Sequence, residues 1–331
     1  MQSTPIGAPT SKSWFRFHPL TAEDRSVMAA LRSVVEPNKG KLRGSAARAP
    51  FDALMSSIIA PKEVTFREDR TGGIPGWWCE PTDAVTGAAI LHLHGGWFNV
   101  GSAAAYRHLV GHIARSASAT AFIPDYRLAP EYPFPAAIED ARASLRSLAG
   151  RGIDRIAVTG DSAGGNLALS LLSLVAAEPG TAILPVAVVV LSPITDLALT
   201  GSSWQTRADA DPYFVREQAE ELLQAYLNGH DPKDPVASPL YGNFVGLPPI
   251  RAQAGDDEVL LDDSLRFVER AVAAGIDARL DVWEGMPHGF VGGIGQTQAA
   301  ASALSAIGEF LSSQLAPRSG KHLTSQVHPE V

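Results

Sequence analysis

One serine in this sequence stands where a nucleophile would be exposed. Ser162 lies in Gly160-Asp161-Ser162-Ala163-Gly164, which directly follows the apolar run Ile153–Thr159 and precedes a segment with helical periodicity. This strand-turn-helix context is typical of a nucleophile elbow, a turn so tight that a β-carbon at either flanking glycine would collide with a neighbouring element. The pattern predicts a strained turn that presents the Ser162 hydroxyl to a carbonyl carbon.

A glycine loop about 65 residues before the serine could stabilise the charge that such an attack creates. His94-Gly95-Gly96-Trp97 ends an early apolar run. Attack on a carbonyl places negative charge on its oxygen, and backbone N–H groups can approach that oxygen where no side chain intervenes. We expect the N–H groups of Gly95, Gly96 and Ala163 to form an oxyanion hole, with Trp97 where a further glycine would stand.

A serine hydroxyl needs a base, and the base needs an orienting acid. Of the nine histidines, His288 is the best placed, because it follows the last expected strand and lies at the sheet edge where Ser162 emerges. The acid should lie between Ser162 and His288 in the chain. Asp257 and Glu258 stand 31 and 30 residues before His288, so spacing does not choose between them. Alternate residues of an extended segment point to opposite sides, so only one of the two can face the histidine.

The remaining charged and metal-ligating residues do not indicate a further catalytic or metal site. His92 and His94, or His108 and His112, could supply two ligands to a metal, but neither pair has the neighbouring carboxylate of a hydrolytic zinc motif. We therefore predict no metal site. A second set of charged side chains is expected to brace a loop rather than to act on substrate, and Asp161 to order the elbow. That set is Asp125, Arg127 and Glu131. Asp262 and Asp263 are expected to charge the start of a helix.

Short apolar runs alternate with helical patterns through most of the chain, as in a parallel sheet covered by helices. Continuous apolar runs are typical of strands that are buried on both faces. The expected strands are Ala88–Leu93, Thr120–Pro124, Ile153–Thr159, Val186–Leu191, Ile250–Ala254 and Arg279–Trp283. Val64–Phe66 and Trp77–Cys79 indicate an antiparallel hairpin around Gly72-Gly73.

Two segments do not follow this alternation. Residues 13–60 indicate two helices and no strand, and residues 196–235 indicate a helical insertion. We assign both to a cap over the carboxyl edge of the sheet, where open α/β sheets bind ligands. The expected organisation is 13–50 as the first part of the cap, 51–195 as the catalytic core, 196–235 as the inserted part of the cap, 236–316 as the rest of the core, and 317–331 as a flexible tail.

Composition excludes several classes of protein. The 331 residues are 45% hydrophobic and 19% charged, which is a globular composition. A net charge of −8 leaves no basic field for nucleic acid. The longest apolar stretch, Ala182–Leu191, is too short to span a membrane, and it contains Pro185. Residues 1–12 lack the features of a signal peptide, and the single cysteine, Cys79, permits no internal disulfide, so we expect a cytoplasmic protein.

Together the motifs resemble the hormone-sensitive-lipase-like branch of the α/β-hydrolases over about residues 50–315. They are His94-Gly95-Gly96, Asp125-Tyr126-Arg127-Leu128-Ala129-Pro130-Glu131, Pro133-Phe134-Pro135-Ala136-Ala137, Gly160-Asp161-Ser162-Ala163-Gly164-Gly165 and His288-Gly289-Phe290. The resemblance implies a mostly parallel, eight-stranded sheet with a helical cap and no cofactor. Where the family shows Asp-Pro-Leu-x-Asp, this chain has Glu258-Val259-Leu260-Leu261-Asp262, which places Glu258 at the catalytic acid and leaves Asp257 as its competitor.

We therefore predict a serine esterase that acts on short- to medium-chain carboxylic esters through an acyl-enzyme, with Ser162, His288 and Glu258 as its triad. A lactone hydrolase on the same triad is the alternative, because the stretch around Glu258 resembles that of monoterpene lactone hydrolases. A receptor that has lost its catalytic histidine is disfavoured by His288, and a peptidase is the third hypothesis. Partners other than a small ester or lactone are not expected, and a homodimer is left open. Cap aromatics could line an apolar pocket or form the core of the cap: Trp14, Phe15, Phe17, Trp204, Tyr213 and Phe214.

Overall fold

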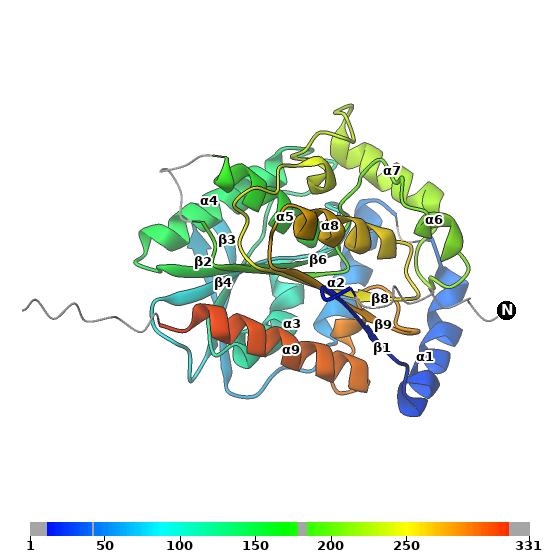
Figure 1. The fold of residues 1–331 in the computed structure, drawn as a ribbon, viewed down its shortest axis with the longest axis horizontal. Coiled ribbons are helices and arrows are strands. Elements are labelled where there is room, and N and C mark those ends of the chain that lie inside the picture. The colour runs from blue at the N-terminus through cyan, green and yellow to red at the C-terminus, as the bar shows by residue number, and fades with distance from the viewer. Residues whose placement is uncertain (1–11, 42, 178–183, 318–331) are drawn as a thin grey trace, which may run out of the picture.

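A mostly parallel sheet runs through the computed structural model, which describes residues 12–41, 43–177 and 184–317 (Figure 1). Among these residues the sheet has nine strands in the order β1-β9-β8-β7-β6-β4-β5-β3-β2. The strands are β1 (Phe15–His18), β2 (Val64–Thr71), β3 (Ile74–Pro81), β4 (Ala88–Leu93), β5 (Thr120–Pro124), β6 (Arg155–Asp161), β7 (Ala187–Leu191), β8 (Ile250–Gly255) and β9 (Ala278–Trp283). Strand β3 pairs antiparallel with both β2 and β5, and the other pairings are parallel.

The central strands form where the sequence has apolar runs without alternation. Every residue of β4 and of β7 is buried. Helices cover both faces of the sheet, so both faces of these strands lie in the core. The six expected parallel strands and the hairpin are confirmed, with ends that differ by at most two residues for the parallel strands and extend further in the hairpin.

The edge strand β1 corrects two expectations. Residues 13–60 were expected to hold no strand, and the family resemblance implied eight strands, but Phe15–His18 pairs in parallel with β9. The His18 ring stacks on Trp283 at 3.8 Å, and its Nε2 lies 2.6 Å from Asp281 Oδ1. A strand of four residues carries too little periodicity to be recognised, and the partner that stabilises it is about 260 residues away in the chain.

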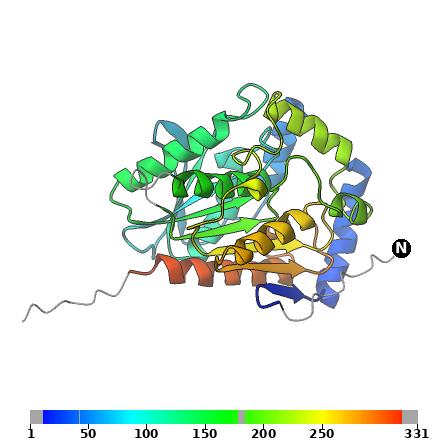
Figure 2. The same cartoon turned by 45° about the horizontal axis from the view of Figure 1, so that its top comes forward.

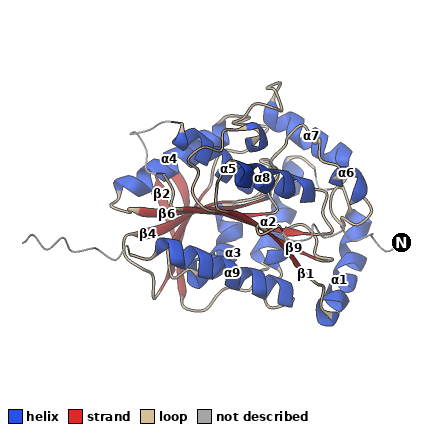
Figure 3. Cartoon of the chain, viewed as in Figure 1, coloured by secondary structure: helices blue, strands red, loops and turns tan. Residues whose placement is uncertain are grey.

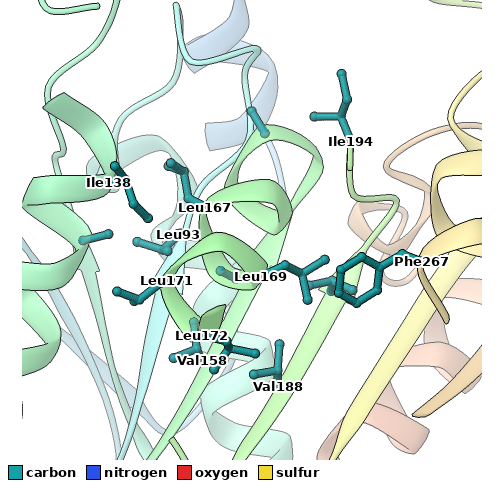
Figure 4. Close-up of a cluster of buried hydrophobic side chains, with 14 of the residues drawn as sticks. Leu93, Ile138, Val158, Leu167, Leu169, Leu171, Leu172, Val188, Ile194 and Phe267 are labelled. Carbon is teal, nitrogen blue, oxygen red and sulfur yellow. The ribbon is translucent and has the colours of Figure 1, made fainter. Parts of the chain in front are cut away.

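Two helical layers enclose the sheet (Figure 3). On one face lie α4 (Ala136–Gly150), α5 (Ser162–Ala176) and α8 (Leu261–Ala273), and on the other α3 (Ala103–Ser116) and α9 (Gln298–Leu315). Helix α5 is buried over most of its length because it lies between the sheet and two other helices. Figure 4 shows its leucines between Ile138 of α4, Phe267 of α8 and the strand residues Val158 and Val188.

The remaining helices are α1 (Ala22–Val35), α2 (Arg48–Ser56), α6 (Ser203–Thr206) and α7 (Arg216–Leu227). Helix α2 packs against α3. Figures 1 and 2 both place α1 beside the α6–α7 segment. The two segments make direct contact, because the Gly40 N–H donates to Tyr213 O at 2.9 Å and Lys39 donates to the Ala208 carbonyl at 2.5 Å. The boundaries given above for the cap remain predictions, and the expected tail beyond Pro317 lies outside the described residues. No helix within the described ranges has both the length and the apolar content needed to cross a bilayer.

Candidate active site

Ser162 occupies a strained turn between β6 and α5. Its φ is +53°, in the left-handed region that side chains with a β-carbon rarely adopt, and it is 4% exposed. The glycines around it have no room for a side chain. A β-carbon on Gly160 would lie 2.3 Å from Gly164 O, and one on Gly164 would lie 1.9 Å from Leu93 O. The turn therefore depends on glycine on both sides of the serine, as the motif indicated.

The start of α5 leaves a backbone donor beside the serine. Ala163 stands in the first turn of the helix, where N–H groups have no partner within the helix. Within the described residues its N–H donates to no protein acceptor. The positive end of the helix dipole favours negative charge at this point. A developing oxyanion would thus meet an unused donor next to Ser162.

The glycine loop differs from the expectation at Gly95. The Gly95 N–H donates to Asp161 Oδ1 at 2.9 Å, so it is already engaged and is not free to bind an oxyanion. A β-carbon on Gly95 would lie 2.2 Å from Asp161 Oδ2, which explains the glycine. Gly96 and Trp97, with φ of +116° and +54°, follow with N–H groups that have no protein acceptor among the described residues. The loop therefore offers its donors one residue later than the sequence motif suggested.

Asp161 ties this loop to the elbow. Besides Gly95 it accepts a hydrogen bond from the Tyr106 hydroxyl at 3.0 Å, and His92 Nε2 lies 3.5 Å from its Oδ1. His94 Nδ1 lies 2.8 Å from Gly95 O, and burial lowers the pKa of His94 to about 4. His94 is therefore neutral and structural at neutral pH. No three metal-ligating side chains come together anywhere in the ranges the structure describes.

His288 and Glu258 form a buried pair. Nδ1 of His288 lies 2.8 Å from Oε2 of Glu258, whose side chain is fully buried, whereas the His288 side chain is 11% exposed. The other carboxylate oxygen accepts the Gly255 N–H at 3.0 Å. Ser192, directly after β7, also hydrogen-bonds to the carboxylate. With Nδ1 held by the acid, the imidazole is left with Nε2 as its reactive nitrogen.

The charges around His288 change its titration. Burial lowers the pKa of His288, but the hydrogen bond and charge of Glu258 outweigh this, so the pKa lies above its ordinary value. Asp211 and Asp161 raise the same pKa through their charge. Burial also raises the pKa of Glu258, against the hydrogen bonds from His288 and Ser192. Each of these carboxylates favours a protonated imidazole.

Asp257, the alternative acid, faces away from His288. Its Oδ2 accepts a hydrogen bond from Arg32 of α1 at 2.6 Å. Its backbone N–H donates to Met286 O at 3.0 Å, and a β-carbon on Gly255 would lie 2.0 Å from the same oxygen. The loop that carries Glu258 and the loop that carries His288 therefore contact each other through their backbones.

The loop after β7 connects Ser162 to the pair. The Ile194 N–H donates to the Ser162 carbonyl at 3.2 Å, two residues after Ser192, which contacts Glu258. The loop after β7 thus links the elbow to the acid. The charge of Asp161, the residue before Ser162, also raises the pKa of His288.

The segment between α6 and α7 contributes an aromatic contact. The Phe214 ring lies 4.9 Å from the His288 ring and 5.1 Å from the Trp97 ring, edge to face in both cases. Phe214 therefore spans from the histidine to the glycine loop. Most of the other aromatic residues expected in the cap pack into the core. Trp14, Phe15 and Phe17 pack at the edge of the sheet, and Trp204 is buried with 4% exposure.

The charged motif after β5 braces the loops, as expected. Asp125 Oδ1 accepts the Ala103 N–H at 2.6 Å at the start of α3. Arg127 forms a bidentate pair with Asp140 of α4. Glu131 pairs with Arg48 of α2 at 2.6 Å. The three side chains thus join the loop to α2, α3 and α4.

Some residues of the site were missed in the sequence. Ser192 gives no local signal. Asp211 stands in Asp211-Pro212, which indicates only a turn, while Val259, which donates to Asp211 Oδ2 at 2.9 Å, is 48 residues away. Contacts of this kind follow from the packing of the cap on the core.

Comparison with known proteins agrees with this geometry. Residues 90–292 match the family of the alpha/beta hydrolase fold. The chain is 38% identical to an acetyl-hydrolase of Streptomyces hygroscopicus over 213 residues, which cover 64% of this chain and 70% of that protein. It is 33% identical to an esterase of Acinetobacter venetianus over 280 residues, 84% and 91% of the two chains. A solved esterase of the bacterial hormone-sensitive lipase family superposes with a TM-score of 0.83 at 36% identity, covering 90% of this chain and 99% of the other.

Proposed function

The chain belongs to the hormone-sensitive-lipase-like branch of the α/β-hydrolases and is a carboxylic-ester hydrolase, and on this premise we propose that Ser162, His288 and Glu258 are its catalytic triad. The contact that supports this most directly is the 2.8 Å hydrogen bond between His288 Nδ1 and Glu258, because it leaves Nε2 to serve as the base. The strained conformation of Ser162 at the end of β6 supports its role as the nucleophile.

The reaction proceeds in two halves. His288 Nε2 removes the proton of the Ser162 hydroxyl while Oγ attacks the ester carbonyl, and the resulting imidazolium is stabilised by Glu258, which stays ionised. The imidazolium then protonates the leaving alcohol, and the C–O bond of the ester breaks to give an acyl-serine. Water, activated by the same histidine, hydrolyses the acyl-enzyme and restores Ser162.

The negative carbonyl oxygen is stabilised by backbone donors. We assign this role to the N–H groups of Gly96 and Ala163, with Trp97 as the next free donor of the loop, because the Gly95 N–H is bound to Asp161. Gly95 and Asp161 instead hold the loop against the elbow. Donors fixed in this way need no reorganisation when charge develops, which is the basis of oxyanion stabilisation.

The aromatic wall of Trp97 and Phe214 favours small esters. Both rings lie next to the proposed catalytic groups, and Trp97 is only 6% exposed, so they restrict the space available to long chains. The Streptomyces relative is named an acetyl-hydrolase, which supports the same size class. We expect short- to medium-chain esters to be hydrolysed best.

Replacement of the serine tests the proposal. Ser162→Ala should keep the fold and lower kcat on p-nitrophenyl butyrate by as much as ~10⁶-fold. Ser170→Ala is the matched control, because Ser170 is a buried serine of the same helix with no hydrogen-bond partner for its hydroxyl among the described residues. A fluorophosphonate should label the wild-type chain at Ser162, as read by peptide mass mapping. Activity of Ser162→Ala within tenfold of wild type would refute the assignment.

A further inference from the structure

Asp211 is a fully buried carboxylate of the cap whose hydrogen bonds reach the core. It lies between α6 and α7. Its Oδ1 accepts the N–H groups of Tyr213 at 2.7 Å and Phe214 at 2.9 Å, and its Oδ2 accepts the N–H of Val259 at 2.9 Å. Its backbone carbonyl accepts a hydrogen bond from Lys39 of the N-terminal segment. One residue thus joins both cap segments to the loop that carries Glu258.

The bonds of Asp211 end on the neighbours of the His288–Glu258 pair. Val259 directly follows Glu258, so the bond to its N–H restrains the backbone beside the acid. Phe214 packs edge to face on the His288 ring at 4.9 Å, so the bond to its N–H restrains the residue that covers the base. Asp211 therefore contacts the two residues that border the pair, one from each side.

The charge of Asp211 also affects the titration of His288 and Glu258. The carboxylates whose charge raises the pKa of the His288 imidazole are Glu258, which contacts it, Asp211 between α6 and α7, and Asp161 on the elbow. Asp211 also raises the pKa of Glu258. Since the site is largely buried, these interactions are screened less than at the surface.

We propose that Asp211 is a positioning residue of the esterase, which holds Phe214 and the Glu258 loop around His288 from the cap. This inference rests on the proposed function of the Ser162, His288 and Glu258 triad. It assigns to the cap a part in the chemistry of the base, in addition to covering the substrate.

Two substitutions test the role, so that the test does not depend on the folding of one variant. Asp211→Asn keeps an acceptor for the Tyr213 and Phe214 turn but loses the charge and presents an N–H donor toward Val259. Asp211→Ser can accept the same turn through its hydroxyl and is also uncharged. The matched control is Asp196→Asn. Asp196 is likewise a fully buried carboxylate near the start of the insertion, and it accepts the N–H groups of Ala198 and Thr200 but does not face His288.

The readouts separate positioning from plain structural support. NMR titration of the His288 ring, assigned by the signal lost in His288→Gln, should show a pKa lower by about 0.5 to 1 unit in both Asp211 variants, because a negative charge near the imidazole is gone. The acidic limb of kcat/KM should move to lower pH by the same amount. At the pH optimum kcat should fall about 10- to 100-fold with little change in KM, because the base and acid lose their alignment. Asp196→Asn should leave the His288 pKa unchanged.

The proposal would be overturned by folded Asp211 variants whose His288 pKa stays within about 0.2 units of wild type. An equal shift in Asp196→Asn would also overturn it, since the effect would then not be specific to this carboxylate. Failure of both Asp211 variants to fold, by circular dichroism, would assign the residue to cap stability alone. The NMR titration does not depend on turnover, so it stays informative even if Ser162→Ala shows that the proposed function is wrong.

Discussion

Replacement of Glu258 by glutamine is the sharpest test of how the base is held. The carboxylate is fully buried, accepts the His288 Nδ1–H at 2.8 Å and accepts the Gly255 N–H at 3.0 Å. Glutamine has nearly the same shape but has no charge, and one of its two terminal atoms is a donor. If its carbonyl oxygen keeps the Gly255 N–H, its amide nitrogen faces Nδ1 and favours the imidazole tautomer with the proton on Nε2.

That tautomer cannot accept the serine proton, and the imidazolium loses its counter-charge. The combined loss in kcat should reach ~10⁴-fold, which corresponds to ~5.4 kcal/mol in transition-state stabilisation at ~1.36 kcal/mol per factor of ten. The fold should survive, because Glu258→Gln preserves volume and can keep the Gly255 hydrogen bond.

Asp257→Asn is the matched control at the neighbouring position. Its carboxylate pairs with Arg32 at 2.6 Å and does not contact His288, so the substitution should reduce kcat less than about tenfold. The assay is kcat on p-nitrophenyl butyrate for both variants, with circular dichroism to confirm folding. If Asp257→Asn loses more activity than Glu258→Gln, the orienting acid is Asp257 and our interpretation of the loop is wrong.

Three further predictions follow from the geometry. The midpoint of the acidic limb of kcat/KM should lie above the ordinary histidine pKa of about 6.5, because Glu258 raises the pKa of His288 and only the neutral imidazole accepts a proton. Activity should fall as the pH drops through this limb, and a midpoint below about 6 would contradict the prediction. Trp97→Gly suits the φ of +54° and removes the ring that packs on Phe214. The ratio of kcat/KM on octanoate to that on butyrate should therefore rise about tenfold, since each methylene newly accommodated contributes roughly 0.8 kcal/mol. An unchanged chain-length profile would show that Trp97 does not limit the pocket. Gly164→Ala should destabilise the fold by ~3 kcal/mol or more in urea unfolding, because the new β-carbon would meet Leu93 O at 1.9 Å. Gly150→Ala, with open space around it, should be neutral or stabilising. Similar unfolding midpoints for the two variants would refute the packing argument.

Features that depend on neighbours in the chain were predictable from the sequence. The strands β4 and β5 begin and end where their apolar runs do, because burial on both faces of a sheet leaves a local, continuous signal. The elbow was equally local, since Gly160 and Gly164 are required by contacts within a few residues of Ser162 or with the adjacent strand. His288 could be selected because the order of strands already placed its loop at the carboxyl edge of the sheet.

Features that depend on side-chain direction or on distant partners were decided only by the tertiary structure. Spacing allowed both Asp257 and Glu258 as the acid, and only the register against the family pattern favoured Glu258. In the fold Arg32 of α1 pairs with Asp257, and Glu258 lies beside His288. The Gly95 N–H looked available for the oxyanion hole until packing placed Asp161 against it.

The same holds for the parts of the chain that join the cap and the sheet edge. Strand β1 exists because β9 offers an unpaired edge, and Asp211 reaches Val259 because the insertion folds back over the acid loop. Local periodicity carries no information about such pairs, since each partner is set by how whole elements pack. The amino-acid sequence by itself thus determined which residues are candidates for the chemistry and which runs form the sheet, whereas the tertiary structure decided which of their side chains, N–H groups and distant partners lie together.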